Sequence, residues 1–341
     1  CLSRGLGDVY KRQREGFVMR IGKLTSQELQ KYVFDKTVAK NPEILQSAGL
    51  AEDCAALRTP KILLLTTDPI TATGNNAGRL AITVSANDVA VSGGTPLCCL
   101  LTIIAPTTAS AEDVGKFMKE AHETAEALGV DIVGGHTEFS EAVNRMVVSC
   151  TMLGTTRRIV KSSGAKAGDS IVMTKSAAIE ATAIMANDHA DKLLKNGLTT
   201  EELVEAREYI AKVSVVEDAK IVWKQNVSCM HDVTEGGVFG AVTELAEASG
   251  LGAMIYADQI PVTHLTAKIC KILDVSPMRL IGSGSILIVT PDPEKVVKSL
   301  RNNGVDATVI GTMRSKKEVT AIGVGKSERL KSAPDELLLI K

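Results

Sequence analysis

Residues 61–92 read KILLLTTDPITATGNNAGRLAITVSANDVAVS, and this stretch decides the fold class. Lys61–Thr66 is a short apolar run that predicts a β-strand. Gly78–Ser92 is rich in Ala, Val and Ile and predicts a buried helix. A strand followed by a buried helix begins a β-α-β alternation, so the stretch indicates a domain that mixes helices and strands.

Two carboxylates stand out within this stretch. Asp68 follows the strand, at the end where ligand sites of α/β proteins gather. Asp88 lies inside the otherwise apolar helix, where a charge is costly unless it is paired or binds a metal. The structural alternatives are a turn at Asp68-Pro69 and a salt bridge from Asp88 to Arg79 or Lys61.

The alternation continues on both sides of a polar, basic boundary at Gly154–Gly168. Ser110 is a suitable N-cap, with Asp113 three residues later, for a helix that ends at Leu128. The remaining expected strands are Leu97–Ile104, Val130–Val133, Arg145–Leu153, Ser170–Thr174, Ala253–Tyr256, Ser285–Val289, Ala307–Gly311 and Val319–Gly323. The remaining expected helices are Thr200–Lys212, Val216–Gln225 and Val238–Ser249. Two α+β domains are expected, at residues 19–158 and 159–341.

Five short segments place acidic or amide groups beside small residues. They are Ala51-Glu52-Asp53-Cys54-Ala55-Ala56, Thr66-Thr67-Asp68-Pro69, Asn87-Asp88-Val89-Ala90, Gly134-Gly135-His136-Thr137-Glu138 and His231-Asp232-Val233-Thr234-Glu235-Gly236-Gly237. Carboxylates that suit a hard cation, next to glycine-rich backbone that can approach phosphate, are what a magnesium-nucleotide site requires. Because Gly325-Lys326-Ser327 lacks the first glycine of a P-loop, we predict an enzyme that uses ATP without one.

The last two segments each allow more than one interpretation. Gly134 and Gly135 follow a predicted strand and would permit a turn, and His136 is a candidate ligand, phosphate donor, general acid or structural histidine. Gly236 and Gly237 precede a predicted helix, where free backbone N–H groups attract an anion. Alternatively, Asp232, Thr234 and Glu235 only cap that helix.

Composition excludes several classes of function. The chain has 341 residues, with 39 basic and 40 acidic ones, so nothing in its charge favours nucleic acid or an anionic membrane as a partner. The longest apolar run, Leu97–Ala105, is far shorter than the roughly 20 residues that span a bilayer. The seven cysteines include no C-x-x-C pair, and we expect reduced thiols in a cytoplasmic protein. Residues 1–18 are basic and precede Met19, so we expect a leader or sequence artefact there.

Taken in order, these motifs resemble the PurM-like superfamily of aminoimidazole ribonucleotide (AIR) synthase, thiamine-monophosphate kinase, selenophosphate synthetase and the hydrogenase maturation factor HypE. The resemblance runs from Gly22 to Thr312 and is closest to the HypE-like, AIR synthase-related branch. It rests on the segments quoted above together with Gly22-Lys23-Leu24 and Ala246-Glu247-Ala248-Ser249-Gly250.

The resemblance implies a ferredoxin-like N-terminal domain that binds ATP and forms a homodimer, and an α/β C-terminal domain that covers the nucleotide. By resemblance, Asp53, Asp68, Asp88 and Asp232 would bind Mg²⁺ and the ATP phosphates. Asp88, His136 and Asp232 are the candidate catalytic residues. The other candidate ATP-binding residues are Asn87, Gly134, Gly135, Thr137, Thr234, Gly236 and Gly237.

The chain also departs from individual members of the superfamily. HypE carries its acyl group on a C-terminal cysteine, whereas no cysteine follows Cys270 here. His136 stands where HypE has aspartate, and the reactive cysteine loop of selenophosphate synthetase has no counterpart between Met19 and Leu50. We therefore expect an Mg²⁺-dependent ATP-using phosphotransferase or ligase that phosphorylates an amide, carbonyl or related oxygen of a small-molecule or protein-borne acceptor, with a maturation protein as a further partner. The alternatives are an AIR synthase-like purine enzyme and a non-catalytic nucleotide-binding partner protein.

Overall fold

The computed structural model describes residues 26–27, 44–46, 50, 52, 55–58, 61–71, 76–323 and 326–340. Asp53, a predicted metal ligand, and the expected leader at residues 1–18 lie outside the described residues. Within the described part of the chain, no helix is long and apolar enough to cross a membrane.

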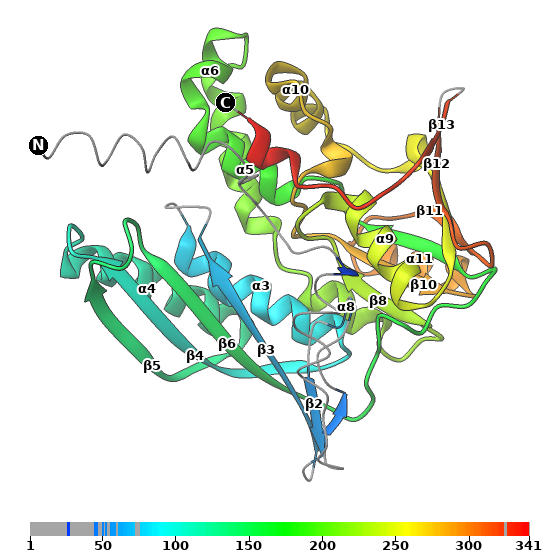
Figure 1. The fold of residues 1–341 in the computed structure, drawn as a ribbon, viewed down its shortest axis with the longest axis horizontal. Helices are drawn as coiled ribbons and strands as arrows, with labels where there is room; N and C mark the ends of the chain where they lie inside the picture. The colour runs from blue at the N-terminus through cyan, green and yellow to red at the C-terminus, as the bar shows by residue number, and fades with distance from the viewer. Residues whose placement is uncertain are drawn as a thin grey trace, which may run out of the picture.

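The first domain is a sheet covered on one face by two helices (Figure 1). Its strands lie in the order β1-β2-β3-β6-β4-β5, and every neighbouring pair is antiparallel except β4 and β5. The elements are β1 (Ile44–Gln46), β2 (Ala55–Arg58), β3 (Ile62–Ile70), α3 (Ala77–Val91), β4 (Thr95–Pro106), α4 (Ala111–Leu128), β5 (Asp131–Ser140) and β6 (Val147–Thr156).

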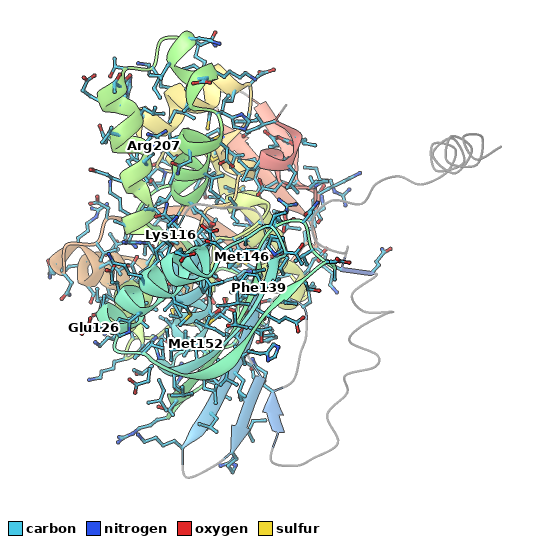
Figure 2. The ribbon with its side chains drawn as sticks, turned by 90° about the vertical axis from the view of Figure 1, so that its left-hand side faces the viewer. Lys116, Glu126, Phe139, Met146, Met152 and Arg207 are labelled. Atoms are coloured by element: carbon cyan, nitrogen blue, oxygen red, sulfur yellow. The ribbon has the colours of Figure 1, made fainter. Side chains whose placement is uncertain are left out.

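The two helices of this domain differ because their surroundings differ. Ser110 and Asp113 form the predicted capping box of α4, and Gly129, with φ 67°, ends the helix in the left-handed conformation. Helix α4 is amphipathic, and Lys116 and Glu126 mark its outer side (Figure 2). Helix α3 is buried nearly all round, because it lies between the first sheet and the second domain (Figure 1).

The second domain contains a larger sheet with strand order β13-β12-β9-β11-β7-β10-β8. Its strands are β7 (Ser170–Thr174), β8 (Cys229–Asp232), β9 (Gly252–Tyr256), β10 (Ile286–Thr290), β11 (Ala307–Arg314), β12 (Val319–Gly323) and β13 (Lys326–Arg329). Its helices are α5 (Ile179–Asp188), α6 (Ala190–Lys195), α7 (Thr200–Glu208), α8 (Val216–Val222), α9 (Gly237–Ala248), α10 (His264–Leu273) and α11 (Pro293–Asn302). Short 3₁₀ turns lie at η2 (Tyr209–Lys212), η3 (Ala257–Gln259), η4 (Pro277–Arg279) and η5 (Glu336–Leu339).

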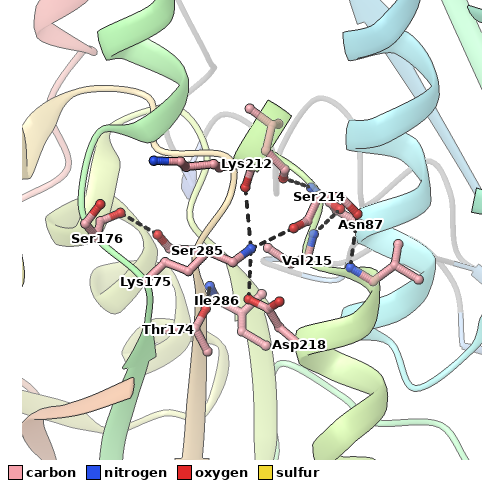
Figure 3. A network of polar contacts seen from close by, with 12 residues as sticks. Asn87, Thr174, Lys175, Ser176, Lys212, Ser214, Val215, Asp218, Ser285 and Ile286 are labelled. Carbon is pink, nitrogen blue, oxygen red and sulfur yellow. Dashed lines mark hydrogen bonds and ion pairs between the residues drawn. The ribbon is translucent and has the colours of Figure 1, made fainter. Parts of the chain in front are cut away.

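One hydrophobic core joins the two domains, and a buried polar contact fixes it. The core contains Val89 of α3 together with Val215, Ala219 and Met230 of the second domain. Asn87 of α3 donates from Nδ2 to the carbonyl of Val213 at 3.0 Å and accepts the N–H of Val215 at Oδ1 at 2.9 Å (Figure 3). The side-chain amide of Asn87 thus satisfies a carbonyl and an N–H group of the backbone segment Val213–Val215 in the second domain.

Lys175 holds the same segment from the other side (Figure 3). Its Nζ donates to the carbonyl of Ser214 at 2.7 Å and forms an ion pair with Asp218 of α8 at 3.0 Å. The backbone of Lys175 adopts φ 50°, a left-handed conformation that costs free energy for a residue with a side chain. The backbone of Lys175 is therefore strained, and the ion pair and hydrogen bonds of its side chain help to offset the cost of that strain.

The structure corrects one local prediction around Gly134 and Gly135. We expected a strand at Val130–Val133 followed by a turn, but β5 continues through both glycines to Ser140. The register of β4 against β5 shifts between Cys99 and Leu100, and Gly135 adopts φ 147°. A Cβ at Gly135 would lie 1.8 Å from the carbonyl oxygen of Leu101, so the glycine permits close strand approach at a bulge.

Removing the amide of Asn87 tests the contact between the domains. Asn87→Ala would leave the buried carbonyl of Val213 and N–H of Val215 without their partner. We expect the free energy of unfolding to fall by about 2–5 kcal/mol, because each orphaned group costs about 1–3 kcal/mol. Chemical denaturation measures this change.

The matched control is Asn196→Ala, which removes an exposed amide bonded to the carbonyl of Lys192. It should change the free energy of unfolding by less than about 0.5 kcal/mol. An equal, small effect of both variants would contradict the role given to Asn87.

Candidate active site

Asp68 and Asp88 lie at the contact between β3 and α3. Residues 64, 66 and 68 of β3 share one face because side chains alternate along a strand, and buried Leu64 shows that this face is turned toward the helices. Ser85 of α3 donates from Oγ to Oδ2 of Asp68 at 3.0 Å, and Thr66 of β3 donates from Oγ1 to Oδ2 of Asp88 at 2.6 Å. The strand and the helix therefore each supply a hydroxyl for the other element's carboxylate.

These reciprocal bonds explain why Asp88 is tolerated within an apolar helix. Its exposed fraction is 9%, and the charge-assisted bond from Thr66 supplies part of the solvation that burial removes. Sequence reasoning identified both carboxylates, and it included Thr66 in the segment around Asp68 without assigning it a role, but it missed Ser85. Ser85 could have been found, because residues three apart share one face of a helix and Ser85 precedes Asp88 by three.

Asp232 approaches the same region from the second domain. It ends the edge strand β8 and is 1% exposed. Met230, two residues earlier, packs in the core shared with α3, so Asp232 points to that side by strand alternation. His231 lies between two carboxylates, with Nε2 2.9 Å from Oε2 of Glu244 and Nδ1 3.7 Å from Oδ1 of Asp232.

A magnesium site can be tested against these side chains. Within the described residues, no group of three or more His, Cys, Asp or Glu side chains could hold a metal ion. Mg²⁺ usually retains waters and binds through one or two carboxylates plus substrate phosphates. Asp68 and Asp88 have the oxygen chemistry for that mode, and the position of Asp53 lies outside the described residues.

The Gly236-Gly237 turn has the predicted place before a helix, but its N–H groups have partners within the chain. The N–H of Gly236 donates to Oδ2 of Asp335 at 2.8 Å, and that of Gly237 donates to the carbonyl of Thr234 at 3.1 Å. Gly237 adopts φ 65°, and a Cβ there would lie 2.6 Å from the carbonyl oxygen of Met278. An anion at the N–H of Gly236 would have to displace the carboxylate of Asp335.

A second buried carboxylate lies near Asp335. Glu180 of α5 is 5% exposed, and burial raises its pKa to about 7, with the negative charge of Asp335 acting in the same direction and hydrogen bonds from Ser283 opposing it. Burial also raises the pKa of Asp335, against the lowering effect of the N–H groups of Gly236 and Leu337. Sequence reasoning missed both residues, since neither lies in a recognisable motif.

His136 lies away from the carboxylate pair within one chain. It belongs to β5 and pairs in register with Thr102, whose partner on β6 is Ser149, whereas Asp68 pairs with Cys150. His136 and Asp68 therefore lie on opposite faces of the sheet, with β6 and β4 between their strands. The side chain of His136 is exposed, with Nε2 3.4 Å from Oε2 of Glu138, and neighbouring Thr137 is exposed as well.

A hollow opens between the two domains near the start of α3. Its volume is about 750 Å³, and its lining includes Arg79, Glu120, Arg207 and Lys212. This size is within the usual range for small-molecule sites, and the charged lining is mixed, because Glu120 and Glu208 lie among the three cations. The lining residues come from α3, α4, α5, α7 and η2, so the hollow depends on how the domains pack.

The fold and the carboxylates define a two-domain α+β protein with acidic groups at its domain contact. The chain belongs to the AIR synthase related family. Residues 51–156 match the family's N-terminal domain, and residues 166–324 match its C-terminal domain.

Curated relatives and solved structures agree with this assignment. The chain is 28% identical over 252 residues to a hydrogenase expression/formation protein of Methanocaldococcus jannaschii, covering 72% of each chain. It is 26% identical over 279 residues to the carbamoyl dehydratase HypE of Escherichia coli, covering 78% of this chain and 79% of that one. A structure of HypE in complex with ATP matches with a TM-score of 0.69 and 20% identity, covering 92% and 96% of the two chains. A HypE–HypF complex matches with a TM-score of 0.69 and 23% identity, covering 89% and 99%.

The raised pKa of Glu180 makes stability depend on pH. Between pH 4.5, its ordinary pKa, and about pH 7, the folded chain retains a proton that the unfolded chain has released. Stability therefore falls as pH rises through this window, by up to about 3 kcal/mol, and this contribution is constant above it. Glu180→Gln cannot ionise and should remove this part of the pH dependence in denaturation experiments.

The control is Glu205→Gln, on the exposed side of α7, which should retain the wild-type pH profile. Asp335 has a raised pKa too, so a residual slope of the same sign should remain in Glu180→Gln. Identical profiles for wild type and Glu180→Gln would exclude Glu180 as the titrating group.

Proposed function

We propose that this protein is an ATP-using enzyme of the HypE-like group that transfers the terminal phosphoryl group to an amide, carbonyl or related oxygen. The observation that carries the proposal is the arrangement of Asp68 and Asp88. Asp68 of β3 accepts a hydrogen bond from a serine of α3, and Asp88 of α3 accepts one from a threonine of β3. Positioning and charge neutralisation are the main means by which proteins accelerate phosphoryl transfer. A rigid pair of carboxylates at a domain contact supports that role.

The residues have separate roles in this proposal. Asp68 and Asp88, with Asp53 as a further predicted ligand, would hold Mg²⁺ together with the ATP phosphates, and the ion when bound neutralises phosphate charge and orients the transferred group. Asp232 was predicted as a fourth ligand, but within the described residues it forms no three-carboxylate group with Asp68 and Asp88. Asn87 was predicted to bind ATP. Because its side chain fixes α3 against the second domain, we propose that it positions the carboxylates and does not contact ATP directly. Thr234, Gly236 and Gly237 would bind the phosphates after Asp335 leaves the N–H of Gly236.

The relatives indicate the chemical class of the acceptor and the kind of partner, but not their identities. One relative is named a carbamoyl dehydratase, and a structural neighbour is a complex of HypE with HypF. We infer a carbamoyl-like or other amide-like acceptor, delivered as a small molecule or on a partner protein. The hollow lined by Arg79, Arg207 and Lys212, together with Glu120 and Glu208, has a suitable volume for a small molecule or a short protein segment.

We also propose a homodimer formed through the open face of the first sheet. Helices α3 and α4 cover the other face, and Leu97 and Leu100 of β4 are 49% and 42% exposed. The hydroxyl of Thr67 is hydrogen-bonded to those of Ser149 and Thr151 on this face. Ser149 pairs with Thr102 of β4, which in turn pairs with His136 of β5, so His136 lies on the same face. A second copy on this face would bury the leucines and bring His136, Gly134 and the neighbouring Thr137 to an interface.

The alternative functions differ in what they require of these residues. An AIR synthase-like purine enzyme would also use the carboxylate pair, and its acceptor would be a ribonucleotide. A non-catalytic nucleotide-binding protein would need the glycine turn but would not need the buried carboxylates. The cost of burying Asp88 supports an enzyme over a binding module. We infer a cytoplasmic location, because the cysteines that the structure describes are free thiols.

Neutralising Asp88 tests the proposed chemistry. Asn at this position can still accept the hydrogen bond from Thr66, so Asp88→Asn should fold but lose the negative charge that attracts Mg²⁺. We expect Mg²⁺-dependent phosphate release from ATP to fall at least about 100-fold, as for loss of one preorganised electrostatic group. Phosphate release and circular dichroism are measured side by side, in the presence of a carbamoyl-type acceptor.

The matched control is Asp131→Asn, an exposed carboxylate at the start of β5 in the same domain. It should retain wild-type turnover. Turnover by Asp88→Asn equal to that of the control would remove Asp88 from the site. ATP binding without turnover in the wild type, with every acceptor class tried, would favour the non-catalytic alternative.

A charge on the open face tests the homodimer. Leu100→Asp places a carboxylate where the second copy would pack, and we expect a shift from dimer to monomer in analytical ultracentrifugation. Leu194→Asp on α6, at a leucine that is 39% exposed, makes the same change elsewhere and should leave the mass unchanged. A monomeric wild type would contradict the proposed assembly.

A further inference from the structure

We propose that a second, basic pocket at the junction of the two domains binds a small phosphorylated compound. Lys61, Arg157, Arg158 and Lys224 line a cavity of about 370 Å³, and in the part of the chain that the structure describes no Asp or Glu lines it. This volume is within the range of small-molecule sites. The positive charges of Arg157, Arg158 and Lys224 create a potential there that attracts an anion.

The Lys61 side of the pocket lies far from Asp68. Lys61 directly precedes β3, and Asp68 lies seven residues further along the same strand. At about 3.3 Å per residue, the two ends of this segment are roughly 23 Å apart. A ligand beside Lys61 would therefore be separate from Asp68, whereas Asp88 lies nearer, since Gly93 of the pocket follows it by five residues, roughly 8 Å along the end of α3.

The backbone that forms the pocket is held rigidly. The hydroxyl of Thr156 lies 2.7 Å from the carbonyl oxygen of Gly93 and accepts the N–H of Arg158 at 3.1 Å. Gly93 has φ 82°, and a Cβ there would lie 2.9 Å from the carbonyl oxygen of Arg158. The backbone that carries Arg157 and Arg158 is thus packed against the turn after α3. Both side chains are exposed, and Nη2 of Arg158 donates to the carbonyl of Val227 at 3.4 Å.

Trp223 forms the wall contributed by the second domain. Its Nε1 donates to the carbonyl of Ala90 at 2.9 Å, which fixes the indole against the end of α3. The ring is half-buried and lines the pocket beside Lys224, so it offers an apolar surface next to the cations. This combination suits a compound that carries a phosphate or diphosphate on a sugar or another partly apolar group.

Elements of both domains meet in the pocket. Lys61, Arg157 and Arg158 flank strands of the first sheet, whereas Trp223 and Lys224 follow α8 of the second domain. A ligand that contacts both sets would favour the packed arrangement of the domains over any arrangement that separates them. Binding here would therefore raise the apparent stability of the chain by mass action.

Trp223 allows a direct test, because it is the only tryptophan of the chain. Inorganic phosphate, pyrophosphate and ribose 5-phosphate are titrated separately without Mg²⁺ while Trp223 fluorescence is recorded. We expect saturable changes, with pyrophosphate or ribose 5-phosphate binding more tightly than inorganic phosphate. Arg157→Ala and Lys224→Ala should each weaken binding about tenfold or more, as loss of a charge-assisted hydrogen bond does.

Two control variants establish whether the fluorescence change comes from this pocket. Lys295→Ala on α11 removes the same charge from an exposed position and should leave the affinity unchanged. Asp131→Asn, which removes an exposed charge at the start of β5, should also bind the probes as the wild type does. No fluorescence change with any probe, or equal weakening by Lys295→Ala, would overturn the proposal.

Discussion

The burial of helix α3 between the two domains is the constraint on which the rest of the structure depends. A helix buried on all sides must satisfy each of its polar side chains within the protein. Ser85 and Asp88 do so toward β3, and Asn87 does so toward the segment at Val213–Val215. The same requirement therefore fixes the carboxylates and the relative position of the domains.

Much of this arrangement could be predicted from local sequence patterns. The apolar run around Asp88 identified both the buried helix and its unusual charge, and the Ser110 capping box located the start of α4. The partner of Asn87 could not be predicted, because Val213 and Val215 lie more than a hundred residues away and are bound through backbone atoms that carry no sequence signal. Helices α5, α6, α10 and α11 were missed as well. Helix α5 is apolar on most sides and lacks a capping side chain, whereas the cap at Thr263 before α10 and Pro293 at the start of α11 were signals that went unused.

The glycine motifs show why a motif alone does not establish a role. Gly134 and Gly135 suggested a turn, but both pair with the long strand β4 just after a register shift, and Gly135 permits close backbone approach there. Gly236 does precede a helix as predicted, and its N–H group attracts an anion as helix ends do. The anion in the structure is the carboxylate of Asp335, which lies 99 residues further along the chain and could not be inferred from the turn itself.

The register of β3 determines which of its side chains face helix α3 and which lie on the open face of the first sheet. Thr66 and Asp68 face α3, whereas Thr67 between them bonds to Ser149 and Thr151 on the open face. A slip of one residue would exchange the faces, placing Asp68 on the open face and Thr67 in the helix contact. The continuous pairing of β3 with β6 from Ile62 to Ile70 opposes such a slip. The long ladder is thus a condition for the carboxylate pair, since a shorter strand would specify the register less strongly.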